Sequence, residues 1–200
     1  MIITMDGVCE VTIQDGEEWI FFDNNFNQKL TPDIIEFLSR YQRVYFGYLF
    51  NQPIDISDED SPTGKSSILP NGIIDLKFGY DFNMPVDNLP DSLTHLELGG
   101  EFNQPVDHLP SCIKTLELDW EFNQSVNNLP IGLTTLKLYG EFNQPVDNLP
   151  DSITHLEIVG EFNQPVDNLP SCIKTLELDW EFNQSVNNLP IGLTTLNLHG

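Results

Sequence analysis

The amino-acid sequence predicts a mainly β solenoid of about nine rungs of about twenty residues each. The pair Phe-Asn recurs six times, starting at Phe82 and always twenty residues apart. The pair Leu-Pro recurs in step with it, starting at Leu89. Each unit then closes on an apolar triplet, such as Leu93, Leu96 and Leu98. A fixed short period of this kind indicates repeats that stack on one another to share a core.

The apolar triplet marks the strand of each rung, because the spacing L-x-x-L-x-L is the strand signature of leucine-rich repeats. Side chains alternate between the two faces of a strand, so Leu96 and Leu98 should point into the core and stack about 4.8 Å from the next rung. Phe102 should form a second column at the corner after the strand, and Val106 and Leu109 should complete the core from the return side. The prolines favour an extended return segment, so we expect an extended convex side and a gently curved solenoid.

The Asn after each Phe is explained by backbone hydrogen bonding. A solenoid corner leaves amide and carbonyl groups unpaired, and a buried Asn side chain carries the donors and the acceptor to pair them in adjacent rungs. We therefore predict a structural ladder behind the Phe column. Its members are Phe82, Asn83, Phe102, Asn103, Phe122, Asn123, Phe142, Asn143, Phe162, Asn163, Phe182 and Asn183.

The chain divides into three parts within one domain. Residues 1–18 are expected to form an N-terminal cap, a hairpin that turns at Asp6-Gly7. Residues 19–80 hold degenerate repeats, with one short helix over 31–40 and an exposed inserted loop over 55–67. Residues 81–200 form six regular repeats, in which 161–200 repeats 101–140 with three differences. The degenerate strand positions are Ile20 and Phe22, Val44 and Phe46, and Leu76 and Phe78.

The charge balance is strongly acidic, with 31 acidic and 8 basic residues and a formal net charge of −23. Nucleic acid and anionic membrane surfaces are excluded as partners, because both are bound through Lys and Arg. A protein partner with a basic patch is the electrostatic match, although the charge could equally serve solubility alone. The start of the chain lacks a signal peptide pattern and no long apolar run occurs, which predicts a cytoplasmic protein. Three widely spaced cysteines without a CxxC pair predict reduced thiols and no cofactor.

The outward positions of the strands vary between rungs, and they are the candidate binding site. Aromatic and charged side chains are mixed there, as in protein interfaces, where Trp and Tyr often anchor binding. The alternative is that the Trp side chains cover the Phe column and that Lys137 belongs to a cross-strand charge ladder. The candidate residues are His95, Glu97, Glu117, Asp119, Trp120, Lys137, Tyr139, His155, Glu157, Glu177, Asp179 and Trp180.

Catalysis and metal binding are not expected. The His95–Glu97 and His155–Glu157 pairs lie three rungs apart, about 14 Å, so one ion cannot bridge them. A column of acidic residues precedes the Phe column and could gather Ca²⁺, although a solvated edge is the favoured interpretation. No nucleophile and base recur together near a predicted cleft. The sequence therefore predicts neither an enzyme nor a metal site.

The segments F-N-Q-P-V, L-P and L-x-L, repeated in register, resemble the FNIP-repeat family of leucine-rich-like proteins. Residues 46–51 and 78–83 match the FGxxFN form of that motif, although Ser replaces Pro at Ser125 and Ser185. The resemblance covers roughly residues 20–200 and implies a binding protein of amoebae or of giant viruses that infect them. Many family members carry an F-box, which implies a substrate receptor in ubiquitin ligation. Residues 1–25 show no F-box pattern.

Two functions follow from these features. The first is a protein-interaction module that binds a host or cellular protein through the strand face, as a substrate receptor or decoy in ubiquitin-related pathways, in the host cytoplasm if the protein is viral. The second is a structural protein that self-assembles, for example as a homodimer, through an uncapped C-terminal end after His199-Gly200, because unpaired strand edges favour association.

Overall fold

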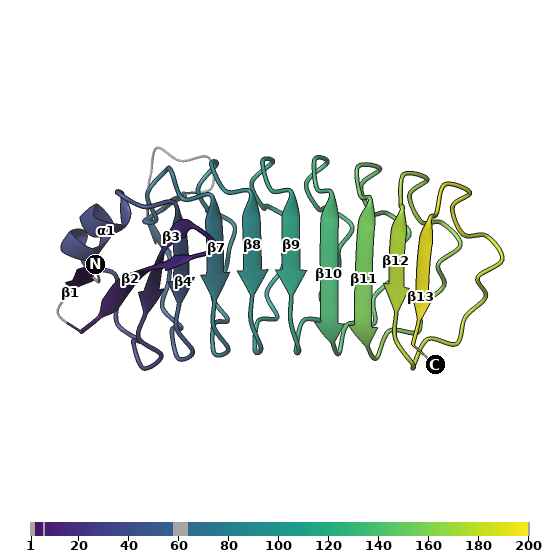
Figure 1. Ribbon diagram of the computed structural model, residues 1–200, viewed down its shortest axis with the longest axis horizontal. Coiled ribbons are helices and arrows are strands. Elements are labelled where there is room, and N and C mark those ends of the chain that lie inside the picture. The colour runs from purple at the N-terminus through teal and green to yellow at the C-terminus, as the bar shows by residue number, and fades with distance from the viewer. Residues whose placement is uncertain (1–2, 6, 58–63, 200) are drawn as a thin grey trace.

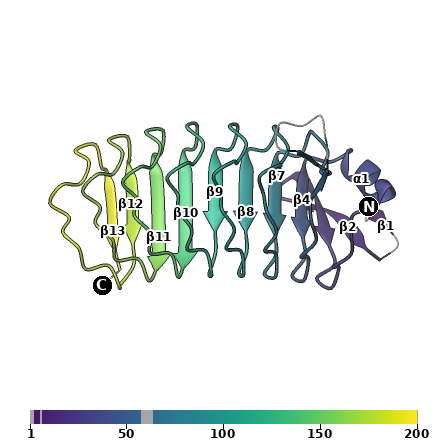
Figure 2. The same ribbon diagram turned by 180° about the vertical axis from the view of Figure 1, so that it is seen from behind.

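The computed structural model describes residues 3–5, 7–57 and 64–199 and shows a β solenoid built on one sheet of eleven strands (Figure 1). Within these residues nine strands run parallel, one for each rung, which confirms the predicted architecture. They are β3 (Glu17–Phe22), β4 (Arg43–Phe46), β7 (Asp75–Phe78), β8 (His95–Leu98), β9 (Thr115–Leu118), β10 (Thr135–Gly140), β11 (His155–Gly160), β12 (Thr175–Leu178) and β13 (Thr195–Leu198). The view from behind shows the same unbroken order of strands (Figure 2).

The strand register places equivalent residues of successive rungs directly beside one another. Leu96 pairs with Leu116, and Leu116 pairs with Leu136. These leucines and the second inward residue of each strand, such as Leu118, are buried through β12. The apolar column of the sheet is therefore continuous, as the spacing of the leucines predicts.

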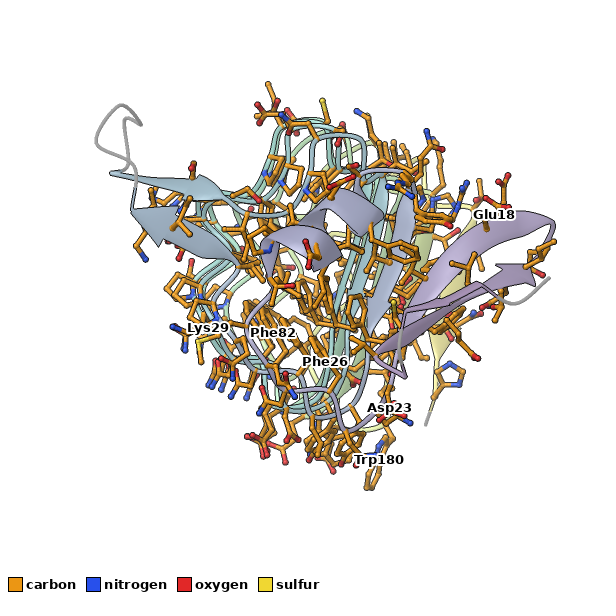
Figure 3. All side chains as sticks on the ribbon, turned by 90° about the vertical axis from the view of Figure 1, so that its left-hand side faces the viewer. Glu18, Asp23, Phe26, Lys29, Phe82 and Trp180 are labelled. Carbon is orange, nitrogen blue, oxygen red and sulfur yellow. The ribbon has the colours of Figure 1, made fainter. Side chains whose placement is uncertain are left out.

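The Phe residues form the expected second column inside the solenoid. Their ring centroids lie 6.0–6.2 Å apart from Phe82 to Phe182, with planes within 11° of parallel. A view along the solenoid shows Phe26 and Phe82 inside it (Figure 3). The rungs are thus further apart at this column than the roughly 4.8 Å typical of paired strands.

The Asn ladder is present, and Gln side chains are part of it. The Oδ1 atom of Asn103 accepts hydrogen bonds from the backbone N–H of Asn123, at 3.1 Å, and from Nε2 of Gln124, at 3.0 Å. The same pair of bonds recurs from Asn27 to Asn163 except at Asn51, which accepts only the backbone N–H of Asn83, because Met84 stands in place of Gln. The expectation that these Asn residues are buried is wrong: Asn103 is half-buried and Asn183 is exposed.

A second ladder of side-chain hydrogen bonds, from Asn to Asp, runs along the return side. The sequence pattern did not predict it. The Nδ2 atom of Asn128 donates to Asp107 of the preceding rung at 3.1 Å, and equivalent bonds join Asn168 to Asp147 and Asn188 to Asp167. These side chains connect return segments that have no strand hydrogen bonds of their own. The extended convex side is therefore stabilised without helices.

The N-terminal region extends the sheet with antiparallel strands. β1 (Ile3–Met5) pairs with β2 (Cys9–Gln14), so these two strands flank the expected turn, of which Asp6 lies outside the described residues. β2 then pairs with β3 through a turn at Asp15-Gly16, where both residues adopt positive φ as in tight hairpins.

The only helix among the described residues is α1 (Pro32–Leu38), and the hydroxyl of Thr31 caps its first turn. The predicted loop over 55–67 is not irregular throughout. It begins and ends in β5 (Asp55–Ser57) and β6 (Lys65–Ser67), which pair with each other and are joined by a 3.0 Å ion pair between Asp55 and Lys65. α1 is too short to cross a membrane, and the described residues contain no other helix.

Candidate functional site

The predicted binding residues fall into two groups in the structure. The first lies on the outer face of β8–β12, and its strand register aligns the acidic and basic side chains in one row. We call this row the charged column; its members are Lys77, Glu97, Glu117, Lys137, Glu157 and Glu177. The second group lies at the corner after the strands, because β9 and β12 end before Asp119 and Asp179. The expectation that the strand face includes Asp119, Trp120, Asp179 and Trp180 is therefore wrong as to their position, which is at the corner.

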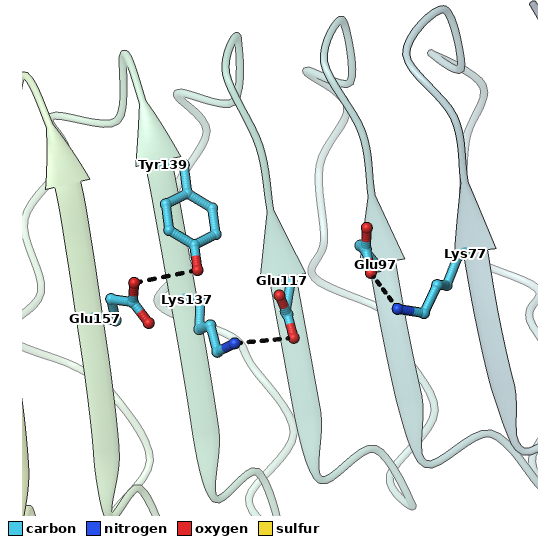
Figure 4. A network of polar contacts seen from close by, with 6 residues as sticks. All are labelled: Lys77, Glu97, Glu117, Lys137, Tyr139 and Glu157. Carbon is cyan, nitrogen blue, oxygen red and sulfur yellow. Dashed lines mark hydrogen bonds and ion pairs between the residues drawn. The ribbon is translucent and has the colours of Figure 1, made fainter. Parts of the chain in front are cut away.

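The charged column is largely paired within itself (Figure 4). The ammonium group of Lys77 lies 2.7 Å from Glu97, and that of Lys137 lies 3.2 Å from Glu117. The hydroxyl of Tyr139 donates to Glu157 at 3.2 Å. The cross-strand ladder weighed as the alternative for Lys137 is thus present. Most of the charge on the strand face is used to hold neighbouring rungs together.

The pKa values on this face follow from the same contacts. Burial raises the pKa of the Tyr139 phenol far above its ordinary value, and the nearby Glu157 carboxylate raises it further. Burial acts to lower the pKa of Lys77, but its hydrogen bond to Glu97 and the attraction of nearby carboxylates outweigh burial and raise that pKa. A hydrogen bond with His199 lowers the pKa of Glu177. Each shift favours the protonation state that keeps the cross-strand contact.

The two His residues of this face contact neighbouring threonines. The Nδ1 atom of His95 lies 2.9 Å from the Thr94 hydroxyl, and that of His155 lies 2.8 Å from the Thr154 hydroxyl. Over the residues that the structure describes, no group of three or more His, Cys, Asp or Glu side chains is arranged to hold a metal ion.

Lys77 and Trp19 belong to this face but were not among the predicted residues. The Lys77 ammonium lies 5.4 Å from the centre of the Trp19 ring, a distance at which a cation is attracted to an aromatic face. Lys77 could have been found, because it occupies the same register position as Glu97 when the degenerate rung is aligned on Leu76. The place of Trp19 on this face could not be predicted from the repeat, because it depends on the antiparallel pairing of β2 with β3.

The corner after the strands carries the exposed aromatic residues. Trp120 is 57% exposed and Trp180 is 71% exposed, and the ring contacts of the Phe column among the described residues include neither, so the alternative that they cover this column is not supported. The carboxylate of Asp119 accepts the backbone N–H of Trp120 at 2.8 Å, and the Asp119 carbonyl accepts the N–H of Phe122 at 3.1 Å. These two bonds stabilise the turn from which the exposed indole projects. Figure 3 shows Trp180 projecting from this corner.

A groove lies between the two Trp residues. In the rungs between them, Gly140 and Gly160 take the place of Trp, and both have positive φ, 69° and 125°. β10 and β11 run on as far as these glycines, so Tyr139 and Val159 line the groove from the strand side. The groove has a volume of about 860 Å³. We call it the corner groove.

Acidic side chains surround the corner groove, and they differ from those of the charged column. Glu141, Glu161 and Glu181 line it, together with Asp119 and Asp179. Among the described residues, the three Glu side chains take part in no ion pair and no side-chain hydrogen bond, whereas the Glu residues of the strand face contact Lys, Tyr or His. The corner therefore presents uncompensated negative charge beside exposed indole rings.

The chain is similar to known repeat proteins. The FNIP Repeat family model matches residues 63–101, 84–108, 102–138, 122–161 and 162–200. Among solved structures, the chain is similar to CroV588, a giant-virus protein whose crystal structure is described as a novel circular LRR protein structure, with a TM-score of 0.77 and 35% identity. The similarity covers 90% of this chain and 26% of that one, so the chain spans about a quarter of the length of CroV588. No curated protein matches. Because the family matches extend without a gap from residue 63 to residue 200, the chain belongs to the FNIP-repeat family.

Proposed function

We propose that this chain is a protein-interaction module that binds another protein across its strand face and the adjoining corner groove. The observation that carries the proposal is the pair of exposed indoles, Trp120 and Trp180, on either side of an open groove. Exposed Trp side chains are costly to solvate, and in interfaces they are the residues that most often dominate binding. The charged column beside them gives a polar border of the kind that surrounds interface cores.

The partner in this proposal is a host protein with a basic patch, because the chain has a net charge of −23 and its corner acids are unpaired. The similarity to a giant-virus protein supports a viral setting, and hence action in the host cytoplasm. A receptor or decoy role in a ubiquitin-related pathway rests on the family resemblance alone. Ubiquitin-ligase subunits among the bound proteins would support that role.

Site-specific photo-crosslinking in amoebal lysate tests the binding surface. A photoreactive residue at Thr175, on the outer face of β12, should give covalent adducts with a host protein. The same residue at Ile131, which is 88% exposed and precedes the strand, serves as the matched control and should give none. Adducts at Ile131 alone, equal adducts at both positions, or no adducts at Thr175 would reject the strand face as the binding surface.

A second candidate function is self-association through the edge of β13. Leu196 and Leu198 occupy core positions of their rung, yet they are 40% and 49% exposed. A further repeat or a second copy of the chain would cover them, and the free strand edge would supply backbone hydrogen bonds. Sedimentation velocity should then show a dimer that forms with increasing protein concentration. A constant monomer over the same range would eliminate this function for the chain.

A further inference from the structure

We propose that the corner groove binds an extended protein segment that carries two arginine or lysine side chains four residues apart. The proposal rests on the proposed function and specifies the chemistry of the partner at this site. It follows from the shape of the groove, from its charge and from the spacing of its two indoles.

The walls and the floor of the groove have different chemistry. Trp120 and Trp180 stand at equivalent positions, and Gly140 and Gly160 leave the space between them without side chains. A methyl group on Gly140 would collide with the Trp120 backbone, and one on Gly160 would collide with the Gly140 backbone, so the close packing of these rungs requires glycine at both positions. An open backbone floor between two aromatic walls suits an elongated ligand.

The rung of Gly100 is a comparison, because the next rung has Trp120 and not a second glycine at this position. The Tyr80 ring lies where a side chain on Gly100 would be, so the space beside a single glycine is filled by the preceding aromatic residue. Tyr80 also stacks on Tyr48, with ring centroids 5.0 Å apart. Two consecutive glycine rungs at 140 and 160 therefore give this stretch of the corner its groove.

The charge of the groove selects a cationic ligand. Glu141, Glu161 and Glu181 are unpaired among the described residues and lie one rung apart, so each repels the next. A guanidinium or ammonium group that enters the groove relieves this repulsion and can lie against an indole face. Arginine fits best, because its planar group stacks on aromatic rings and donates to carboxylates at the same time. A neutral apolar segment would leave the carboxylates unpaired.

The spacing of the indoles sets the spacing of the cations. Trp120 and Trp180 are three rungs apart, which is about 14 Å at the spacing of paired strands and about 18 Å at the wider spacing of the neighbouring Phe column. An extended chain advances about 3.3 Å per residue, so four residues span about 13 Å, and the long Arg side chains at both positions cover the remaining distance. Residues i, i+2 and i+4 also point to the same side of an extended chain. The cations at i and i+4 then reach one indole each, and residue i+2 lies over the glycines.

Synthetic peptides test this assignment on the intact chain. Two nine-residue peptides of identical composition carry two Arg residues, either four positions apart or adjacent, and a third carries citrulline in place of Arg. Binding is followed by the indole N–H signals in two-dimensional NMR, of which the chain has three. The signals of Trp120 and Trp180 should move, and that of Trp19, which is 8% exposed, should not.

The expected result is that the peptide with four-residue spacing binds at least about tenfold more tightly than the adjacent-Arg peptide, and that citrulline abolishes binding. Trp120→Ala and Trp180→Ala should each remove this preference. Glu141→Gln with Glu161→Gln should weaken binding about tenfold, whereas Asp91→Asn with Asp151→Asn, an equal change of charge at the opposite corner, should not.

Two results would overturn the assignment. Equal binding of both Arg peptides, unaffected by the Trp substitutions, would mean that the acidic surface attracts cations without a defined site. The absence of binding by every peptide would mean that the groove does not take a cationic segment. Neither result affects crosslinking at Thr175, so the proposed function is judged separately.

Discussion

The ammonium group of Lys137 lies 3.2 Å from the carboxylate of Glu117, its register partner in the preceding rung. Glu157 is the register partner on the other side, so Lys137 separates two carboxylates in a row of like charges. Both members of the ion pair are less than one-third exposed, which limits screening by solvent. One lysine thus lowers the electrostatic repulsion over several rungs of the sheet.

Lys137→Glu should lower the free energy of unfolding by about 1–2 kcal/mol, because it places like charges directly opposite each other on adjacent strands. Lys137→Asn, which reproduces the residue at the equivalent position 197, should cost about half as much, since it removes the pair without adding a charge. Urea denaturation at low and high salt measures the difference. It should shrink at 1 M salt, and equal stability of the two variants at low salt would contradict the prediction.

The Asn ladder predicts a position-dependent effect. Asn123→Ala removes the acceptor of two hydrogen bonds, from the Asn143 backbone and from Gln144, and should cost about 1–3 kcal/mol. Asn183→Ala is the matched control, because its side chain accepts no hydrogen bond from the described residues, and it should cost much less. Chemical denaturation of the two variants is the measurement. Equal losses would show that the ladder bonds add nothing beyond the side chain itself.

The core of the solenoid could be predicted from the sequence, because each stacked residue must be apolar in every rung. Leu96, Leu98 and Phe102 follow from the period alone, and all three are buried. The charged column could be found in the same way, since register partners share one position in the repeat. Gln124 was not predicted, because one Asn in each rung already accounts for unpaired backbone groups at the corner.

The corner groove could not be predicted, because it depends on backbone conformation and on empty space. The sequence shows glycine at 140 and 160, but not that β10 and β11 run on to these residues or that both adopt positive φ. The exposure of the two indoles is also not specified by the pattern: Trp120 follows a carboxylate that accepts its N–H, whereas Trp180 is exposed without such a bond among the described residues. These are local geometries that a repeat pattern does not specify.

Gly140→Ala should destabilise the protein by about 2 kcal/mol or more, because alanine is strained at a φ of 69° and its methyl group would meet the Trp120 backbone. Gly192→Ala is the matched control. There the added methyl group would meet the end of the flexible Lys174 side chain and make an ordinary contact with the Ser171 carbonyl oxygen, so the change should stay within about 0.5 kcal/mol. Thermal denaturation compares the two. A Gly140→Ala variant as stable as the parent would refute the backbone constraint.

Tyr139 predicts how stability changes at alkaline pH. Burial and the Glu157 carboxylate raise the pKa of the Tyr139 phenol in the folded state above its value of about 10 in an unfolded chain. The folded state therefore holds this proton more tightly than the unfolded state does. The resulting stability is fully present below about pH 10 and is lost as the pH rises beyond it.

Tyr139→Phe should remove that loss, so the free energy of unfolding should fall less steeply above pH 10 in the variant than in the parent. At pH 7 the variant should be less stable by about 1 kcal/mol, because the hydrogen bond to Glu157 is gone. Urea denaturation between pH 7 and pH 11 measures both effects. Glu157→Gln is the companion variant: it keeps an acceptor but removes the charge, so its pH dependence should lie between the other two. Parallel pH profiles for all three proteins would show that folding does not raise the pKa of Tyr139, and equal profiles for the parent and Glu157→Gln alone would show that Glu157 does not contribute to it.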